Sequence, residues 1–294
     1  MRPMTTRRNF VIGGLGAAAA PAFAAEPDAH RRALAAARAA QARADRLLRG
    51  QGLVRGTVAE RLRNLAADPR YLYPDDGAGR DRAVAEMNAR LAALRPVLRR
   101  AFGELPIAPA EVRRMSAADV AAGKGGYREP GAYYVDLRNI RQRPSWTLPS
   151  VAFHEVTPGH LLQLPLQRPG SKPPDGVFEG WAIYAEQLAA DLGAYAHDPL
   201  GEIGYLQWRL FRLGRVVADT GMAQLGWSQD RAAGAMRELQ GFDIAFVTIA
   251  ADVARMAREP GRFAADGLYA LELARLRPRS PALWPAFHRK VLRA

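Results

Sequence analysis

Long segments without proline or glycine decide what this chain can fold into. Residues 28–49 are rich in Ala, Arg and Leu and contain neither Pro nor Gly, which predicts a long helix. Residues 57–66 predict a second helix, and residues 79–102 a third, which Pro96 should kink because it lacks the backbone donor. In the third segment, apolar side chains recur at helical spacing, at Val84, Met87, Leu91, Leu94, Val97 and Leu98. The chain is therefore predicted to be mainly α-helical.

One short strand is expected between the helical halves. Residues 131–137 read Gly-Ala-Tyr-Tyr-Val-Asp-Leu, a pattern typical of a strand. Strong helical segments resume near Pro149, Asp175, Pro199 and Ser228. Ser228 is the predicted N-cap of its helix. These patterns predict a single helical domain over residues 25–294, with a short strand or hairpin before the helix near Pro149.

The composition excludes several classes of protein. Hydrophobic residues make up 49% and charged residues 24% of the 294 residues, which is typical of a globular chain rather than a disordered one. There is no Cys, so disulfides, thiolate metal sites and a Cys nucleophile are excluded. The net charge of +13 favours a solvated basic surface over a nucleic-acid interface, because no aromatic residues interleave with the Arg-rich helix faces. We therefore expect no nucleic-acid partner.

The N-terminal residues predict an export signal. Residues 6–11 read Thr-Arg-Arg-Asn-Phe-Val, and an uncharged stretch follows that ends in Ala22-Phe23-Ala24, an A-x-A cleavage pattern. The alternative is a membrane anchor, but a stretch of about 16 residues is shorter than the roughly 20 needed to span a bilayer. The prediction is a twin-arginine signal over residues 1–24, a periplasmic or secreted protein, and no stable membrane anchor after cleavage.

Two of the five histidines stand six residues apart, in the sequence His-Glu-Val-Thr-Pro-Gly-His. A His-Glu pair followed by a second His is typical of zinc hydrolases, in which both imidazoles bind the metal and the Glu takes a proton from the metal-bound water. On a regular helix, His154 and His160 would point about 240° apart. Pro158 and Gly159 can break the helix and bring His160 back. The alternative is a helix end with an ordinary, hydrogen-bonded His.

Two carboxylates share one stripe of the next helical segment. Residues 179–190 contain only Glu179 and Glu186 as charged residues, and a spacing of seven places them about 20° apart on a helix. Buried carboxylates are costly unless they are paired, protonated or bound to a metal. Eighteen residues separate His160 from Glu179, the interval at which aminopeptidase-N-type zinc peptidases carry their third ligand. Glu179 is therefore the predicted third ligand. Glu186 is expected to orient one of the ligands without binding the metal itself. The alternative is that both carboxylates pair with arginines.

These residues resemble a known family. The sequences His-Glu-Val-Thr-Pro-Gly-His at 154–160 and Glu-Gly-Trp-Ala-Ile-Tyr-Ala-Glu at 179–186 are similar to the motifs HExxPGH and EGWAxYAE of the bacterial domain of unknown function 885 family. Residues 58–74, 131–138 and 211–221 also resemble it. The resemblance implies a helical, metallopeptidase-like domain with one zinc ion per chain and peptides as substrates.

Two departures from the family are visible. Family members are commonly longer, so this chain resembles the C-terminal, motif-bearing half alone. The family commonly has an Arg-Tyr pair and a Tyr-Lys pair near its C-terminus, where this chain has Arg255-Met256 and Asp266-Gly267. If those tyrosines stabilise the oxyanion, another group must do so here, and Arg255 and Tyr269 are candidates.

The resemblance supports two hypotheses of function. In the first, the chain is an exported zinc peptidase with His154, His160 and Glu179 as ligands and Glu155 as general base. In the second, it is a non-catalytic relative that binds peptide or a protein partner.

Four further residues carry expectations about the site. Tyr133 and Tyr134 lie on the predicted strand, which pairs with an extended substrate in zinc peptidases of this type, and alternation should turn one ring to the cleft and the other to the core. Arg215 and Asp219 stand four apart on one helix face, which favours a structural ion pair over a catalytic role.

Overall fold

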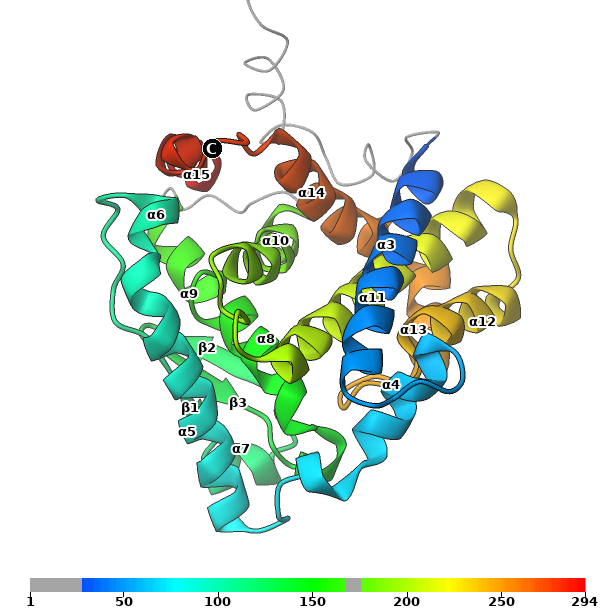
Figure 1. Ribbon diagram of the computed structural model, residues 1–294, viewed down its shortest axis with the longest axis horizontal. Coiled ribbons are helices and arrows are strands. Elements are labelled where there is room, and N and C mark those ends of the chain that lie inside the picture. Colours follow the sequence, from blue (N-terminus) through cyan, green and yellow to red (C-terminus); the bar gives the residue numbers. More distant parts are fainter. Residues whose placement is uncertain (1–27, 168–175, 294) are drawn as a thin grey trace, which may run out of the picture.

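The computed structural model in Figure 1 describes residues 28–167 and 176–293, so the predicted export signal at residues 1–24 lies outside the described residues. The protein is mainly α-helical, as predicted, with one small three-stranded sheet. Among the described residues, no helix is both long and apolar enough to cross a membrane.

The N-terminal helix packs along the longest helix of the chain. Helix α3 (Ala29–Gly50) runs beside α11 (Pro199–Leu225), although the two are far apart in sequence (Figure 1). Apart from Leu48, the buried side chains of α3 are all alanines, namely Ala29, Ala33, Ala37, Ala40 and Ala44. Small side chains let the two backbones approach closely, and we call this contact the alanine seam.

The next two predicted helices form with the expected breaks. Helix α4 (Val58–Ala67) begins with a capping box, in which the Thr57 side chain accepts from the Glu60 backbone N–H and Glu60 accepts from Thr57. The helix predicted over residues 79–102 is divided around Pro96 into α5 (Gly77–Leu94), the 3₁₀ turn Arg95–Val97 and α6 (Arg99–Phe102). The kink predicted at this proline is confirmed.

The sheet lies against α5 and has three strands, whereas a single strand or a hairpin was expected. Its strands are β1 (Glu111–Arg114), β2 (Tyr127–Glu129) and β3 (Ala132–Val135), and the short helix α7 (Ala117–Ala121) joins β1 to β2. The order is β1-β3-β2, with β3 parallel to β1 and antiparallel to β2. Strand β3 is the predicted one.

The later helices enclose the site. Helix α10 (Val177–Asp191) packs between α8 (Leu148–Glu155) and α14 (Arg262–Leu276), and α11 crosses beside them. Helix α12 (Gln229–Gln240) begins at the predicted N-cap Ser228, whose side chain accepts from the Arg231 backbone N–H. The remaining helices are α9 (His160–Gln163), α13 (Ile249–Arg258) and α15 (Trp284–Leu292).

Candidate metal centre

The Pro-Gly turn between α8 and α9 reverses the chain. Helix α8 ends at Glu155, and α9 begins at His160. A Cβ atom on Gly159 would lie 1.8 Å from the carbonyl oxygen of His154, so only glycine fits there. The Trp181 indole N–H donates to the Pro158 carbonyl at 3.0 Å and fixes the turn against α10. As a result, the rings of His154 and His160 lie 5.0 Å apart, centroid to centroid.

The Glu179 carboxylate faces both histidines. Its oxygens lie 3.4 Å from His154 Nε2 and 3.3 Å from His160 Nε2, and one ligand atom from each residue lies within 4.8 Å of the others. His160 is fully buried, and its Nε2 has no hydrogen-bond partner among the described residues. Two imidazoles and one carboxylate that converge around an unsatisfied nitrogen fit a zinc ion, whose catalytic sites take three such ligands.

Neighbouring side chains fix the orientation of the two histidine rings. The Glu186 carboxylate binds His154 Nδ1 at 2.8 Å and accepts from the Ser150 hydroxyl at 2.7 Å. His160 stacks on Phe178, with the ring centroids 4.1 Å apart. Because Nδ1 of His154 is engaged by Glu186, its Nε2 is the nitrogen that faces Glu179, the arrangement usual for a metal-binding His.

The electrostatics of the cluster follow from burial and hydrogen bonds. Burial lowers the pKa of His154, but hydrogen bonds with Glu179 and Glu186 outweigh it and raise the pKa to about 9. Burial lowers the pKa of His160. Burial would raise the pKa of Glu179, yet the two histidine rings that face its carboxylate hold the pKa well below its usual range. A metal ion that bound to this cluster would displace a proton from it, so its affinity would depend on pH.

Glu155 lies beside the ligands and forms an ion pair that the sequence did not predict. Its carboxylate accepts from the Arg128 guanidinium, which β2 contributes. Arg128 also lies over the Phe178 ring, 5.5 Å from its centroid. The predicted base is therefore held in place by an arginine of the sheet.

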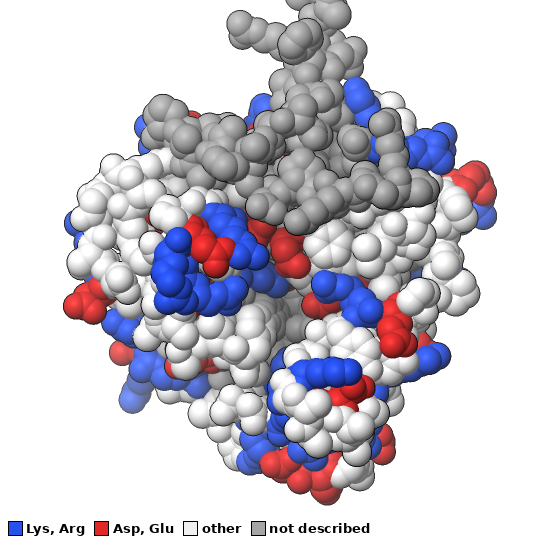
Figure 2. All heavy atoms as spheres, turned by 180° about the vertical axis from the view of Figure 1, so that it is seen from behind, with Lys and Arg blue, Asp and Glu red and all other residues white. Residues whose placement is uncertain are grey.

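A cavity of about 360 Å³ joins these groups. His154, Glu179 and Glu186 line it with Glu155, and so do arginines, other carboxylates and aromatic rings. The lining residues are Gly125, Gly126, Tyr133, Asp136, Arg143, Val151, His154, Glu155, Glu179, Glu186, Trp208, Arg212, Arg215, Phe246 and Arg255. Basic and acidic groups also stand side by side on the outer face shown in Figure 2, rather than forming separate patches.

The two strand tyrosines point to opposite sides, as alternation requires. Tyr133 is buried and lines the cavity, whereas Tyr134 is half-buried and stacks on Tyr127 with centroids 4.7 Å apart. The expectation that their strand pairs with a substrate is wrong, because β3 already has a neighbour on each side. The edge strand near the cavity is β2, and Gly125 and Gly126 just before it line the cavity.

The expected ion pair between Arg215 and Asp219 does not form. Arg215 makes two hydrogen bonds to Asp252 on α13, at 2.6 and 2.8 Å. Asp219 accepts from the backbone N–H groups of Gly261 and Ala264, at 2.8 and 2.9 Å, and so caps α14. The prediction was wrong because each side chain finds a partner on a different neighbouring helix.

The two oxyanion candidates lie in different places. Arg255 lines the cavity, 3.8 Å from Asp252. Tyr269 is buried against α10, where its ring lies beside Gly180, and burial raises its pKa to about 12. Among the described residues, the cavity lining includes Arg255 and not Tyr269.

Sequence reasoning missed three arginines of the site. Arg128, Arg143 and Arg212 contact or line the cavity, and none was singled out. For Arg212 a signal existed, because it stands three residues before Arg215 on a largely apolar helix. Such spacing places both side chains on one face.

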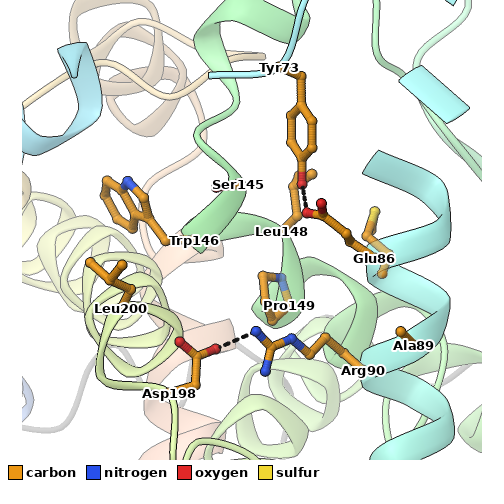
Figure 3. Close-up of a pocket in the computed structure, with 11 residues that line it drawn as sticks. Tyr73, Glu86, Ala89, Arg90, Ser145, Trp146, Leu148, Pro149, Asp198 and Leu200 are labelled. Carbon is orange, nitrogen blue, oxygen red and sulfur yellow. Dashed lines mark hydrogen bonds and ion pairs between the residues drawn. The ribbon is translucent and has the colours of Figure 1, made fainter. Parts of the chain in front are cut away.

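A second cavity, of about 240 Å³, lies between α5 and the first residues of α8 and α11 (Figure 3). Its polar groups pair with each other, since Tyr73 donates to Glu86 and Arg90 lies 2.7 Å from Asp198 (Figure 3). None of the metal-centre residues lines it. The Trp146 indole nitrogen in its wall is buried without a hydrogen-bond partner among the described residues, but the His-His-Glu cluster lies elsewhere, so the first cavity is the candidate site.

The fold and the site define a mainly helical protein with a His-His-Glu cluster at one charged cavity. The family described as "Bacterial protein of unknown function (DUF885)" matches residues 25–293, so the chain belongs to this family. The resemblance noted in the sequence motifs is thereby confirmed at the level of the family.

Two solved structures are similar to the chain. One, described as the "putative lipoprotein from Colwellia psychrerythraea", is 29% identical with a TM-score of 0.77, over 97% of this chain and 52% of that one. Another, "a putative lipoprotein of unknown function from Shewanella oneidensis", is 17% identical with a TM-score of 0.63, over 90% and 53%. The chain spans about half the length of both. No curated protein matches it.

Proposed function

We propose that this protein is an exported zinc-dependent peptidase. The observation that carries the proposal is the convergence of His154, His160 and Glu179 at a cavity that Glu155 also lines. When bound by these three ligands, zinc would lower the pKa of a water molecule toward about 7 and polarise the scissile carbonyl.

The chain's own residues divide the remaining work. Glu155 would accept the proton of the attacking water and pass it to the leaving amine. Arg128 holds the Glu155 carboxylate at the cavity wall. Glu186 and Ser150 keep His154 oriented. An extended peptide would lie along the free edge of β2, where Gly125 and Gly126 leave room for a backbone.

The proposal of export rests on the N-terminal residues. The twin arginines and the A-x-A pattern within residues 1–24 support a twin-arginine signal and a periplasmic or secreted location. Similarity to two structures described as lipoproteins is in keeping with export. We also propose that this chain corresponds to the motif-bearing half of longer members of the family.

The substitution Glu155→Gln tests catalysis. It should keep zinc and the fold but lower peptide hydrolysis by about 10²–10⁴-fold, because an amide of the same size cannot accept a proton. Zinc content, circular dichroism and digestion of a peptide library give the three readouts. Glu104→Gln is the matched control, since Glu104 is exposed and lies outside the cavity lining.

A non-catalytic relative is the second candidate function. The ion pair between Arg128 and Glu155 favours it, because the arginine occupies the carboxylate that would have to accept the proton of the water. Wild-type protein that holds one zinc ion per chain, cleaves no peptide of the library and still retains peptides would establish this alternative.

A further inference from the structure

Four arginines line the same cavity as the metal-centre residues, and two of them have a carboxylate partner. Arg215 is bound by Asp252 through two hydrogen bonds, and Arg255 lies 3.8 Å from the same carboxylate. The Nε atoms of the other two, Arg143 and Arg212, have no hydrogen-bond partner among the described residues.

Arg143 is a buried cation whose charge is not balanced by a close carboxylate. Its residue is 8% exposed, and its Nε has no hydrogen-bond partner among the described residues. Asp136 also lines the cavity, but Arg138 occupies both oxygens of Asp136 at 3.0 and 2.7 Å. A buried guanidinium without a partner is costly, so its retention indicates that something else completes the site.

Arg212, on α11, is in a similar situation. Its Nε is buried without a hydrogen-bond partner in the part of the chain that the structure describes. The one carboxylate within 4 Å there is Glu186, at 3.9 Å, and both Glu186 oxygens already bind His154 and Ser150. The side chain lies over the rings of Trp208 and Phe211, which fix its direction. Glu186 therefore leaves most of the hydrogen-bonding capacity of Arg212 unused.

We propose that Arg143 and Arg212 bind a carboxylate of the substrate, a step that rests on the proposed peptidase function. A guanidinium matches a carboxylate with paired hydrogen bonds, and the unsatisfied Nε atoms supply donors for them. The Oε1 atom of Glu186 lies 3.9 Å from Arg212 Nε and 2.8 Å from Nδ1 of His154, a residue of the proposed metal site. A bound carboxylate therefore lies close to the scissile carbonyl.

The size of the cavity limits what carries that carboxylate. A volume of about 360 Å³ is at the small end of ligand pockets, and it accommodates only a short piece of peptide. Two groups of a peptide could supply a carboxylate so near the scissile bond. One is the C-terminus, which would make the protein a carboxypeptidase, and the other is an Asp or Glu side chain. Both share the recognition chemistry, and the two are separated by experiment.

Binding is measured without turnover, on zinc-loaded Glu155→Gln protein, by titration calorimetry. The probes are acetyl-Ala-Ala-Ala as free acid, the same peptide as C-terminal amide, and acetyl-Ala-Glu-Ala as amide. We expect the free acid or the Glu-containing amide to bind at least about tenfold more tightly than the uncharged amide. Preference for the first identifies the C-terminus as the source, and preference for the second identifies an acidic side chain.

Arginine variants test whether Arg143 and Arg212 cause the preference for carboxylate-containing probes. Arg143→Gln and Arg212→Gln should each remove most of it, whereas Arg99→Gln, which alters an exposed arginine on α6, should not. Circular dichroism checks the fold, and the comparison of probes on the parent protein needs neither variant. Equal binding of all three probes overturns the inference, and so does an acid preference that both arginine variants retain.

The outcomes also separate this inference from the proposed function. If the wild-type protein hydrolyses free-acid and amide peptides at equal rates, the carboxylate site is wrong and the peptidase stands. If the acid binds selectively through the arginines but no peptide is cleaved, the carboxylate site stands and the peptidase is wrong.

Discussion

His160 illustrates how much a single side chain can indicate about a site. It is fully buried, stacked on Phe178, and its Nε2 faces Glu179 without a hydrogen bond from the described residues. A protein interior rarely leaves a buried nitrogen unsatisfied. The proposed metal site of His154, His160 and Glu179 would satisfy this nitrogen.

Removal of either histidine should lower bound zinc well below one ion per chain. His154→Ala and His160→Ala each remove one of three protein ligands, and Glu179→Gln should act less completely because an amide is a poorer ligand. Glu186→Gln should retain more metal than Glu179→Gln, since Glu186 acts through His154.

Elemental analysis of purified variants measures the zinc content, with His197→Ala as control because that histidine is exposed. Zinc at full occupancy in His160→Ala would show that the turn does not deliver a ligand. Loss of metal in Glu186→Gln but not in Glu179→Gln would reverse the two assignments.

The sequence indicated the histidines and glutamates but not the arginines around them. The chain has only five His, and Glu179 and Glu186 stand at diagnostic spacings from His154 and His160, so a pattern can single these residues out. Lys and Arg together number 42, and nothing in the local sequence shows that Arg143 is buried. Burial of one arginine among many is decided by tertiary packing, which a linear pattern does not contain.

At the scale of elements, the turn between α8 and α9 is the part that assembles the site. Trp181 of α10 donates to the Pro158 carbonyl, so the same helix supplies Glu179 and fixes the turn that presents His160. The two sequence motifs therefore contact each other directly in the fold.

Gly159→Ala should lower zinc content and thermal stability together. Its Cβ would overlap the carbonyl of His154, and the shift needed to relieve the contact moves a ligand. Gly234→Ala is the matched control on α12, because nothing lies within 4 Å of the added methyl group. There, alanine should raise stability by about 0.5–1 kcal/mol.

Metal analysis and thermal melts of both variants provide the comparison. Full zinc occupancy in Gly159→Ala would mean that the turn relaxes elsewhere and does not position His160.

Helices were easier to predict than strands in this chain. The periodicity around Met87 and the caps at Thr57 and Ser228 are local signals, and the structure places helices at all three. Strand β1 has one buried residue, Val112, and no run of alternating apolar residues, so only its pairing with β3 makes it a strand.

At the scale of the whole molecule, His288 ties the C-terminal helix to two distant parts of the chain. Its Nδ1 donates to the Ala101 carbonyl and its Nε2 accepts from the Tyr184 hydroxyl, both at 2.7 Å. Burial lowers the pKa of His288 to about 4, against an ordinary value of 6.5. The fold therefore requires the neutral ring.

Stability should fall as the pH drops from about 6.5 to about 4. In this window the unfolded chain takes up a proton at His288 and the folded chain does not, so acid favours unfolding, by up to about 3 kcal/mol below pH 4. Denaturant unfolding at several pH values measures this. His288→Gln should be less stable at pH 7 but show a shallower loss of stability between pH 6.5 and 4. An unchanged slope in that variant would assign the acid sensitivity to other groups.

At the alanine seam between α3 and α11, substitutions that enlarge a side chain should be more damaging than substitutions that shorten one. In most cores, truncating a large side chain does the damage, because it leaves a cavity. The five buried alanines of α3 have almost nothing to truncate, and each is less than 6% exposed in a helix that packs along α11. Any added methylene must instead force the two helices apart. Along the seam, therefore, enlarging a side chain should cost more stability than shortening one.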